Sequence, residues 1–424
     1  MTPNCESAFY ILQGLVSIEE FLGSMHIMGE KLRFKNEREI KLGHIKGDVE
    51  IENCPVVIPE KGKEIVIEGE LNIRGDTEIH GSLKAEYLEI DGRNTSEIDG
   101  DLIIARSVRV RRGQLRVTGS ATANKISIGA ALNVGQNLTV TTISIGGALK
   151  VGGNATAEDI SVGGAIKIEG HLDAKSLNVG GAAKCTTGRI GKVDVGGTFK
   201  AEGAVEIGSI DVGGTIVVGP DSHVLHIDVG GSFKSEGDVT FEDLDVGGAA
   251  KFAGDAKGKR VDVGGSVRAE KSLMLTENLD VGGAAVVSTD LVVGEEIEVG
   301  GSLEAGNLIE APVIDVGGSI RAIHIKATKD FRIGRRGEVR GFVESPDITV
   351  SESARGGSYY GDSIRVEERA RVKNLYGREI YLERDVRVEG EVLYTERLEA
   401  EPGVYFGKEQ QQVKQLPKLS DLVK

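Results

Sequence analysis

Tryptophan is absent from this 424-residue chain, and proline and aromatic residues are scarce. With 10 Phe and 8 Tyr, the chain must fill a core mainly with small branched side chains, which suits a narrow, layered core. The 8 Pro exclude collagen, although the 60 Gly are about twice the ordinary share. Val, Ile and Leu are plentiful and recur in a pattern, which argues against intrinsic disorder.

Cysteine and positive charge are also limited. Cys5, Cys54 and Cys185 are too far apart for a disulfide framework or a zinc motif, and they favour a reducing compartment. The net charge of −15 disfavours binding to a nucleic-acid backbone. The chain contains no run of about 18 apolar residues, so the sequence predicts no membrane-spanning helix. No Lys or Arg occurs before Lys31, so the charged start of a secretory signal is missing. We therefore expect a cytoplasmic protein.

The most informative feature is an internal repeat at a nearly constant period. The pentapeptide apolar-polar-Val/Ile-Gly-Gly (once Gly-Ala) occurs twelve times, once in every repeat, beginning at Ile126, Ile143, Ile160, Leu177, Val193, Ile210, Ile227, Leu244, Val261, Leu279, Ile297 and Ile314. The period continues without Gly-Gly to Leu398 and, more loosely, upstream to Ile40. Self-similarity at a fixed period indicates a solenoid.

Each repeat holds three short segments in which apolar residues alternate with other residues. In residues 160–176 these apolar pairs are Ile160 and Val162, Ile166 and Ile168, and Leu172 and Ala174. Alternation is the period of a β-strand, and Gly-Gly would break a helix. We therefore predict an all-β, parallel β-helix (β-solenoid) that is triangular, with about 17 residues per coil.

Further details follow from this fold class. The usual chirality of parallel crossovers favours a right-handed coil, and the regular hexapeptide typical of left-handed triangular solenoids is missing. Glycines such as Gly163, Gly164 and Gly170 are expected at corners with left-handed backbone angles. Phe199, Phe233, Phe241 and Phe252 are expected to fill the core locally.

Two outward positions of the repeat carry charge. The second residue of the motif forms an acidic series: Asp194, Asp211, Asp228, Asp245, Asp262, Asp280, Glu298 and Asp315. The next face carries a basic series: Lys150, Lys167, Lys184, Lys200, Lys234, Lys251, Arg268 and Arg321, interrupted by Val217, Val286 and Glu304. Both series are interpreted as solvated surface, since exposed ion pairs contribute little. The alternative is lateral bundling, in which the two series attract neighbouring molecules.

No catalytic or cofactor motif is evident. The chain has no phosphate-binding loop and no nucleophile elbow, and of its His residues only His223 and His226 are close in sequence. Residues 126 to 320 contain no insertion longer than one residue, whereas enzymes on solenoids usually carry a distinctive loop. We predict a non-enzymatic protein with no cofactor, no metal and no nucleic-acid partner.

The glycine-cornered coils, and above all the charged, alternating segment Ile364 to Gly390, resemble the bactofilins, polymer-forming cytoskeletal proteins. This resemblance implies a right-handed triangular β-helix that stacks end to end into nonpolar filaments without nucleotide. It also implies, for some members, membrane binding through a short hydrophobic N-terminal stretch. The solenoid of this chain is several times longer than the usual family core.

We divide the chain into an N-terminal segment (1–39), a single continuous solenoid (40–406) and a flexible C-terminal tail (407–424). The N-terminal segment is interpreted as a cap or partner-binding element and alternatively as a membrane foot, through its apolar residues Phe9, Ile11, Leu12, Leu15, Phe21 and Leu22. The last coil is expected to polymerise through Leu393, Val404, Tyr405 and Phe406, because an uncovered strand edge is a template for another chain.

The sequence thus predicts a scaffold subunit that assembles end to end into nucleotide-independent filaments, with itself as the partner. The alternatives are a β-helix enzyme of the acyltransferase type and a rod-like adhesin or interaction scaffold.

Overall fold

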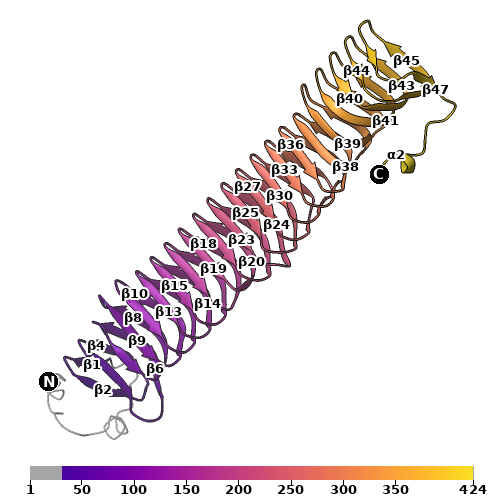
Figure 1. Ribbon diagram of the computed structural model, residues 1–424. Helices are drawn as coiled ribbons and strands as arrows, with labels where there is room; N and C mark the ends of the chain where they lie inside the picture. The colour runs from indigo at the N-terminus through magenta and orange to yellow at the C-terminus, as the bar shows by residue number, and fades with distance from the viewer. Residues whose placement is uncertain (1–30, 424) are drawn as a thin grey trace, which may run out of the picture. The chain divides into compact units, whose positions relative to one another are not determined.

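The computed structural model describes residues 31–423 of the chain. About 67% of the structure is β-strand and about 1% is helix. The strands form a parallel β-solenoid of about 22 turns with roughly 17 residues per turn (Figure 1). The predicted fold class is confirmed.

Contacts divide the chain into two compact units, residues 1–170 and residues 171–424. The described part of each unit, residues 31–170 and residues 171–423, is a stack of coils. In the first unit, one coil consists of β16 (Ala155–Val162) and β17 (Ala165–Ile168). β16 pairs in parallel with β14 (Leu138–Ile145), and this register is interrupted at Glu158, where β16 turns from one face to the next. β17 pairs with β15 (Ala148–Val151) on the third face. Each coil therefore has three faces.

The second unit repeats this arrangement. β24 (Ser222–Val229) pairs with β26 (Val239–Val246), and β25 (Ser232–Ser235) pairs with β27 (Ala249–Phe252). Ile227 lies opposite Leu244 in the next coil. Ile227 is 3% exposed, whereas the adjacent Asp228 is exposed. The predicted assignment of inward and outward positions is therefore correct here.

The core is a stack of Ile, Val, Leu and Ala side chains with a few aromatic rings among them. All four phenylalanines predicted as local fillers are buried. The ring of Phe252 lies 5.7 Å from that of Phe233 and 5.9 Å from that of Phe241, measured between centroids. These rings fill space that the smaller side chains of neighbouring coils leave.

The Gly-Gly corners do not have the left-handed backbone angles that we expected, so that expectation is wrong. Gly163, Gly164 and Gly170 are not among the positive-φ glycines of the described chain. A Cβ added to Gly164 would instead lie 2.6 Å from the carbonyl oxygen of Gly147, one coil earlier. These glycines are required because successive corners stack too closely to admit a side chain.

Strand pairing extends beyond both predicted ends of the solenoid. β1 (Leu32–Lys35) pairs with β4 (Val49–Glu52), so coils begin before residue 40. β47 (Gln410–Gln412) pairs with β45 (Val392–Ala400), and α2 spans Leu419–Leu422. Strand pairing therefore passes the predicted bounds of 40 and 406, and the segment predicted as a flexible tail contains a strand and a short helix within residues 407–423. A short polar strand such as β47 shows no apolar alternation, and it forms because β45 offers backbone partners.

Candidate functional site

The side chains in the sequence that could serve as nucleophiles or metal ligands include one pair of neighbouring His residues and three Cys residues. His223 Nδ1 lies 2.7 Å from Thr240 Oγ1, and His226 Nδ1 lies 3.0 Å from Asp243 Oδ2, so each imidazole pairs separately with the following coil. Burial raises the pKa of the Cys185 thiol to about 12, which makes it a poor nucleophile. Within residues 31–423, no group of three or more His, Cys, Asp or Glu side chains could hold a metal ion.

The fold brings a long series of like-charged side chains together on its surface, the acidic row. We use this name for one outward carboxylate from each of eight successive coils: Asp194, Asp211, Asp228, Asp245, Asp262, Asp280, Glu298 and Asp315. Each is the direct cross-strand partner of the next. With coils ~4.8 Å apart, the row is about 34 Å long from first to last Cα.

The carboxylates of the acidic row have no cationic partner among residues 31–423, whether as an ion pair or as a side-chain hydrogen bond. Like charges opposite each other on neighbouring strands repel. Burial, followed by the charges of Asp262 and Asp228, raises the pKa of Asp245. The row is therefore a line of negative charge without an ion pair of its own within residues 31–423, and Arg332 lies directly opposite its last member, Asp315, in the next coil.

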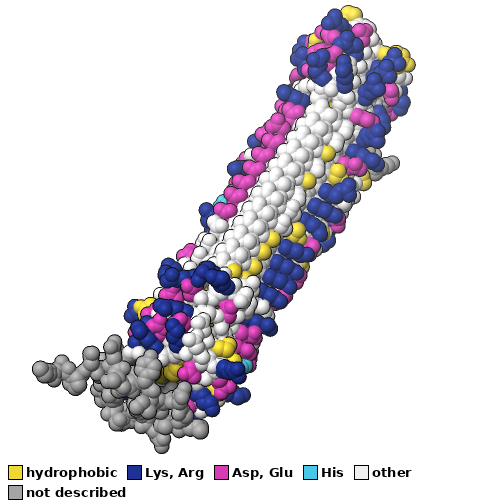
Figure 2. Space-filling view, turned by 90° about the vertical axis from the view of Figure 1, so that its left-hand side faces the viewer, with side chains coloured by type: hydrophobic (Ala, Val, Ile, Leu, Met, Phe, Trp, Pro, Cys, Tyr) yellow, Lys and Arg dark blue, Asp and Glu magenta, His cyan; other side chains and the backbone are white. Residues whose placement is uncertain are grey.

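The basic row lies on the adjacent face of the same coils. We define it as Lys184, Lys200, Lys234, Lys251, Arg268 and Arg321, and the register places Val217, Val286 and Glu304 in the same series. Figure 2 shows acidic side chains (magenta) along one border of a pale stripe and basic side chains (dark blue) along the other. The Gly-Gly corners lie between the two rows in every coil.

Several members of the basic row already touch a carboxylate of their own chain. Lys184 lies 2.6 Å from Glu202, and Lys251 lies 2.6 Å from Glu270. Lys234 pairs with Glu236 at 3.1 Å. The carboxylates in these pairs are roughly 35–47% exposed, so the pairs contribute little to stability and their cations can change partners.

The second candidate surface is the last turn of strands. We call this the C-terminal edge: residues 397–400 of β45, Val404 with the adjoining β46 (Tyr405–Phe406), and β47. Residues 397–400 pair only with β43 (Asn374–Leu382), β46 only with β44 (Arg387–Val388), and β47 only with β45. Within the described chain, the opposite side of all three segments has no strand partner. The edge therefore presents unpaired backbone groups on three faces.

Apolar side chains of the C-terminal edge are incompletely covered. Leu398, Val404 and Phe406 are half-buried, whereas the inward residues one coil earlier, Ile380 and Leu382, are at most 2% exposed. α2 buries none of its own residues. In Figure 1, the chain after β47 runs alongside the stack to α2. Hydrophobic side chains and open strand edges thus coincide at this end.

Three of the four residues predicted for polymerisation lie at this edge, namely Val404, Tyr405 and Phe406. Tyr405 is 55% exposed, and the Arg387 guanidinium lies 5.3 Å from the centre of its ring. Leu393 is different, because β47 pairs over it through Gln411. Leu393 is therefore one layer inside the edge and is not part of the candidate surface.

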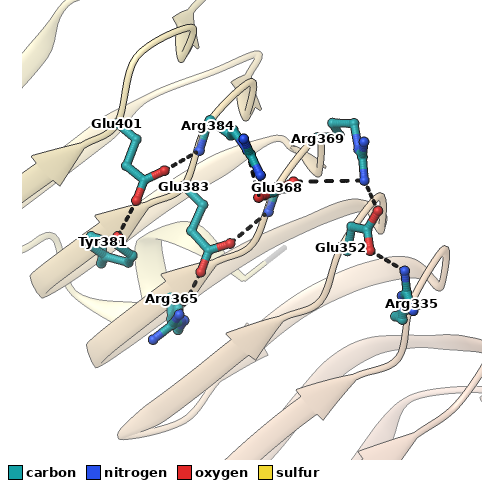
Figure 3. Close-up of polar contacts among 9 residues, drawn as sticks. All are labelled: Arg335, Glu352, Arg365, Glu368, Arg369, Tyr381, Glu383, Arg384 and Glu401. Carbon is teal, nitrogen blue, oxygen red and sulfur yellow. Dashed lines mark hydrogen bonds and ion pairs between the residues drawn. The ribbon is translucent and has the colours of Figure 1, made fainter.

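The coils next to the C-terminal edge are held by a network of ion pairs at one corner, shown in Figure 3. Glu352 binds both Arg335 and Arg369, which come from the coils on either side. One coil further, Arg384 Nε donates to Glu368 Oε1 at 2.7 Å. Hydrogen bonds from Arg369 and Arg335 lower the pKa of Glu352.

A second set of carboxylates in Figure 3 ties the corner backbone together. Glu383 accepts a hydrogen bond from the backbone N–H of Glu368 at 3.2 Å and binds Arg365 at 2.6 Å. Glu401 accepts from the N–H of Arg384 at 3.1 Å and from Tyr381 Oη at 2.6 Å. The coils that support the C-terminal edge are thus cross-linked by side chains as well as by strand pairing.

This network was not predicted from the sequence. It occupies the corner where Gly-Gly stops, and Arg336, Ser353, Arg369 and Asp385 there have positive φ. The detectable signal was a charged corner pair that recurs in several of these coils, as in Arg335-Arg336, Glu368-Arg369 and Arg384-Asp385.

The N-terminal residues predicted to form a cap, partner site or membrane foot (Phe9, Ile11, Leu12, Leu15, Phe21 and Leu22) lie outside the described residues. Across the part of the chain that is described, no helix is both long and apolar enough to cross a membrane.

Comparison with known proteins adds no relative. No family model, no curated protein and no solved structure matches this chain.

Proposed function

We propose that this chain is a structural scaffold whose molecules join end to end through the C-terminal edge, in the manner that its resemblance to the bactofilins implies. The main observation in support is that unpaired strand segments and half-buried apolar side chains lie together at one end of the solenoid. A monomer would leave both in water, whereas a second copy would satisfy the backbone groups and bury Leu398, Val404 and Phe406.

The surroundings of the edge favour this use. Ion pairs and backbone-capping carboxylates fix the coils beneath it, so docking requires little ordering of the surface. The simplest contact joins two C-terminal edges across a two-fold axis, since such a contact needs only one self-complementary patch.

The test compares wild type with Phe406→Arg by sedimentation velocity at tens of micromolar. Salt of about 0.5 M reduces the Debye length to roughly 4–5 Å and suppresses purely ionic contacts. We expect wild type to form species larger than a monomer and Phe406→Arg to be monomeric, because two charges would meet in the contact. Negative-stain electron microscopy should show wild-type particles joined at their ends.

The matched control is Met274→Arg. Met274 is 42% exposed on β31 (Leu273–Leu275), on a side face far in sequence from the edge, so this variant adds the same charge elsewhere. It should assemble like wild type. A monomeric wild type, or a Phe406→Arg variant that assembles equally well, would refute the proposal.

A further inference from the structure

We propose that the acidic row of one molecule docks laterally on the basic row of a second copy of this chain. This contact is separate from the C-terminal edge and does not depend on the proposed function. The acidic row extends through eight consecutive coils, and within residues 31–423 none of its carboxylates forms an ion pair, although Arg332 lies opposite Asp315 at the end of the row. A row of this kind attracts a partner that carries positive charge at the same spacing.

The chain itself carries such a partner surface. The basic row also contributes one residue per coil, because the strands of both rows pair in parallel with the equivalent strands of the next coil. Lys234, Lys251 and Arg268 are consecutive in it, just as Asp228, Asp245 and Asp262 are consecutive in the acidic row. Two molecules aligned side by side therefore match charge for charge over at least three coils.

The two rows cannot satisfy each other within one molecule. They lie on adjacent faces with the Gly-Gly corner between them, and no ion pair within the described residues joins a member of one row to a member of the other. The basic row instead pairs weakly with Glu202, Glu236, Glu270 and Glu304, all on its own side of the corner. On docking, each cation of the basic row leaves its exposed carboxylate for a carboxylate of the second molecule's acidic row, or binds both.

The surface between the rows imposes no steric barrier. A shallow groove runs over the corner, lined by glycines and the small residues that follow some of them, and at its C-terminal end by Arg336 and Glu338; the glycines are Gly248, Gly265, Gly283, Gly301 and Gly318. These glycines are explained by coil stacking and do not themselves indicate a binding site. Their consequence is that no long side chain in the groove lining between Gly248 and Ser319 holds a second molecule away from either row, since Arg336 and Glu338 lie one coil beyond the last members of both rows.

The experiment uses full-length protein carrying Phe406→Arg, so that the end contact is removed. In about 50 mM salt, where the Debye length is roughly 14 Å, we expect this parent to self-associate, and raising the salt to about 0.5 M should dissociate it. An acid-reversed variant carries Asp228→Lys, Asp245→Lys and Asp262→Lys. A base-reversed variant carries Lys234→Glu, Lys251→Glu and Arg268→Glu. Each variant alone should associate more than about tenfold more weakly than the parent.

The decisive measurement is an equimolar mixture of the two reversed variants. In the mixture, every altered row meets a row of opposite charge, so association should return. Recovery also shows that both variants are folded. A control with Thr240→Lys and Met274→Lys adds positive charge to the third face and should associate like the parent. The proposal is overturned if the parent remains monomeric at low salt, if the reversed variants associate as well as the parent, or if mixing restores nothing.

Discussion

The two glycines of a Gly-Gly corner should tolerate substitution very differently. A Cβ at Gly231 would lie 2.2 Å from the carbonyl oxygen of Gly214, whereas a Cβ at Gly230 would lie 2.9 Å from that of Gly213. Ordinary contact begins at 3.4 Å, so the local shift that Gly231→Ala requires is more than twice the shift for Gly230→Ala. The Gly214 oxygen also accepts the N–H of Ser232 at 3.0 Å, and that hydrogen bond would lengthen.

These shifts translate into unequal free energies. Overpacking costs about 1–3 kcal/mol and a lost hydrogen bond about 1 kcal/mol, while replacing Gly by Ala regains about 0.4–1 kcal/mol from the unfolded chain. We therefore expect Gly231→Ala to destabilise the local structure by about 2–3 kcal/mol and Gly230→Ala to destabilise it less, by about 1 kcal/mol.

Native-state hydrogen exchange at the strands around Gly214 and Gly231 is the appropriate measurement. Long repeat arrays open in parts, so one global melting temperature would average over many coils. Equal effects of Gly230→Ala and Gly231→Ala on local opening would refute the stacking explanation, as would a harmless Gly231→Ala.

Three further substitutions test the register and the charged corner. Ile227→Asp should destabilise the protein by about 3 kcal/mol or more in denaturant titrations, because it buries a charge. Asp228→Ser should change the stability by less than about 0.5 kcal/mol, because Asp228 is exposed. Equal effects of the two substitutions would mean that the inward and outward faces are exchanged. Arg369 and Arg335 lower the pKa of Glu352 from 4.5. The ionised Glu352 therefore stabilises the folded corner fully above about pH 4.5, and this stabilisation is lost as the pH falls through the lower, folded-state pKa. We expect hydrogen exchange at this corner to become faster below about pH 4.5 in wild type and not in Glu352→Gln.

The sequence predicted the strands and their facing directions because the repeat constrains them twice. Alternation within each segment assigns inward and outward positions, and the regular period assigns each residue its neighbour in the next coil. Asp228 illustrates both: it follows the buried Ile227 and lies between Asp211 and Asp245. A one-residue slip would reverse every face, so the register is strongly determined.

The corners were harder to predict, because one residue pattern serves two physical needs. Glycine permits positive φ and also permits close backbone approach, and the letters Gly-Gly do not distinguish them. The structure assigns close approach to Gly231 and positive φ to non-glycine residues such as Ser353 and Arg369. The Arg–Glu network was missed for a related reason, since its members become neighbours only when the coils stack.

The two proposed contacts differ in symmetry, and that difference determines what each can build. A contact between two C-terminal edges uses the same patch on both molecules, so alone it closes after two copies. Docking of an acidic row on a basic row uses different patches, so each molecule retains one free row of each sign and further copies can join. Pairing at the ends extends the assembly by one step, whereas pairing at the sides propagates. An assembly that uses both contacts should therefore widen into sheets or closed rings, and lengthwise growth into filaments requires a contact in addition to the C-terminal edge.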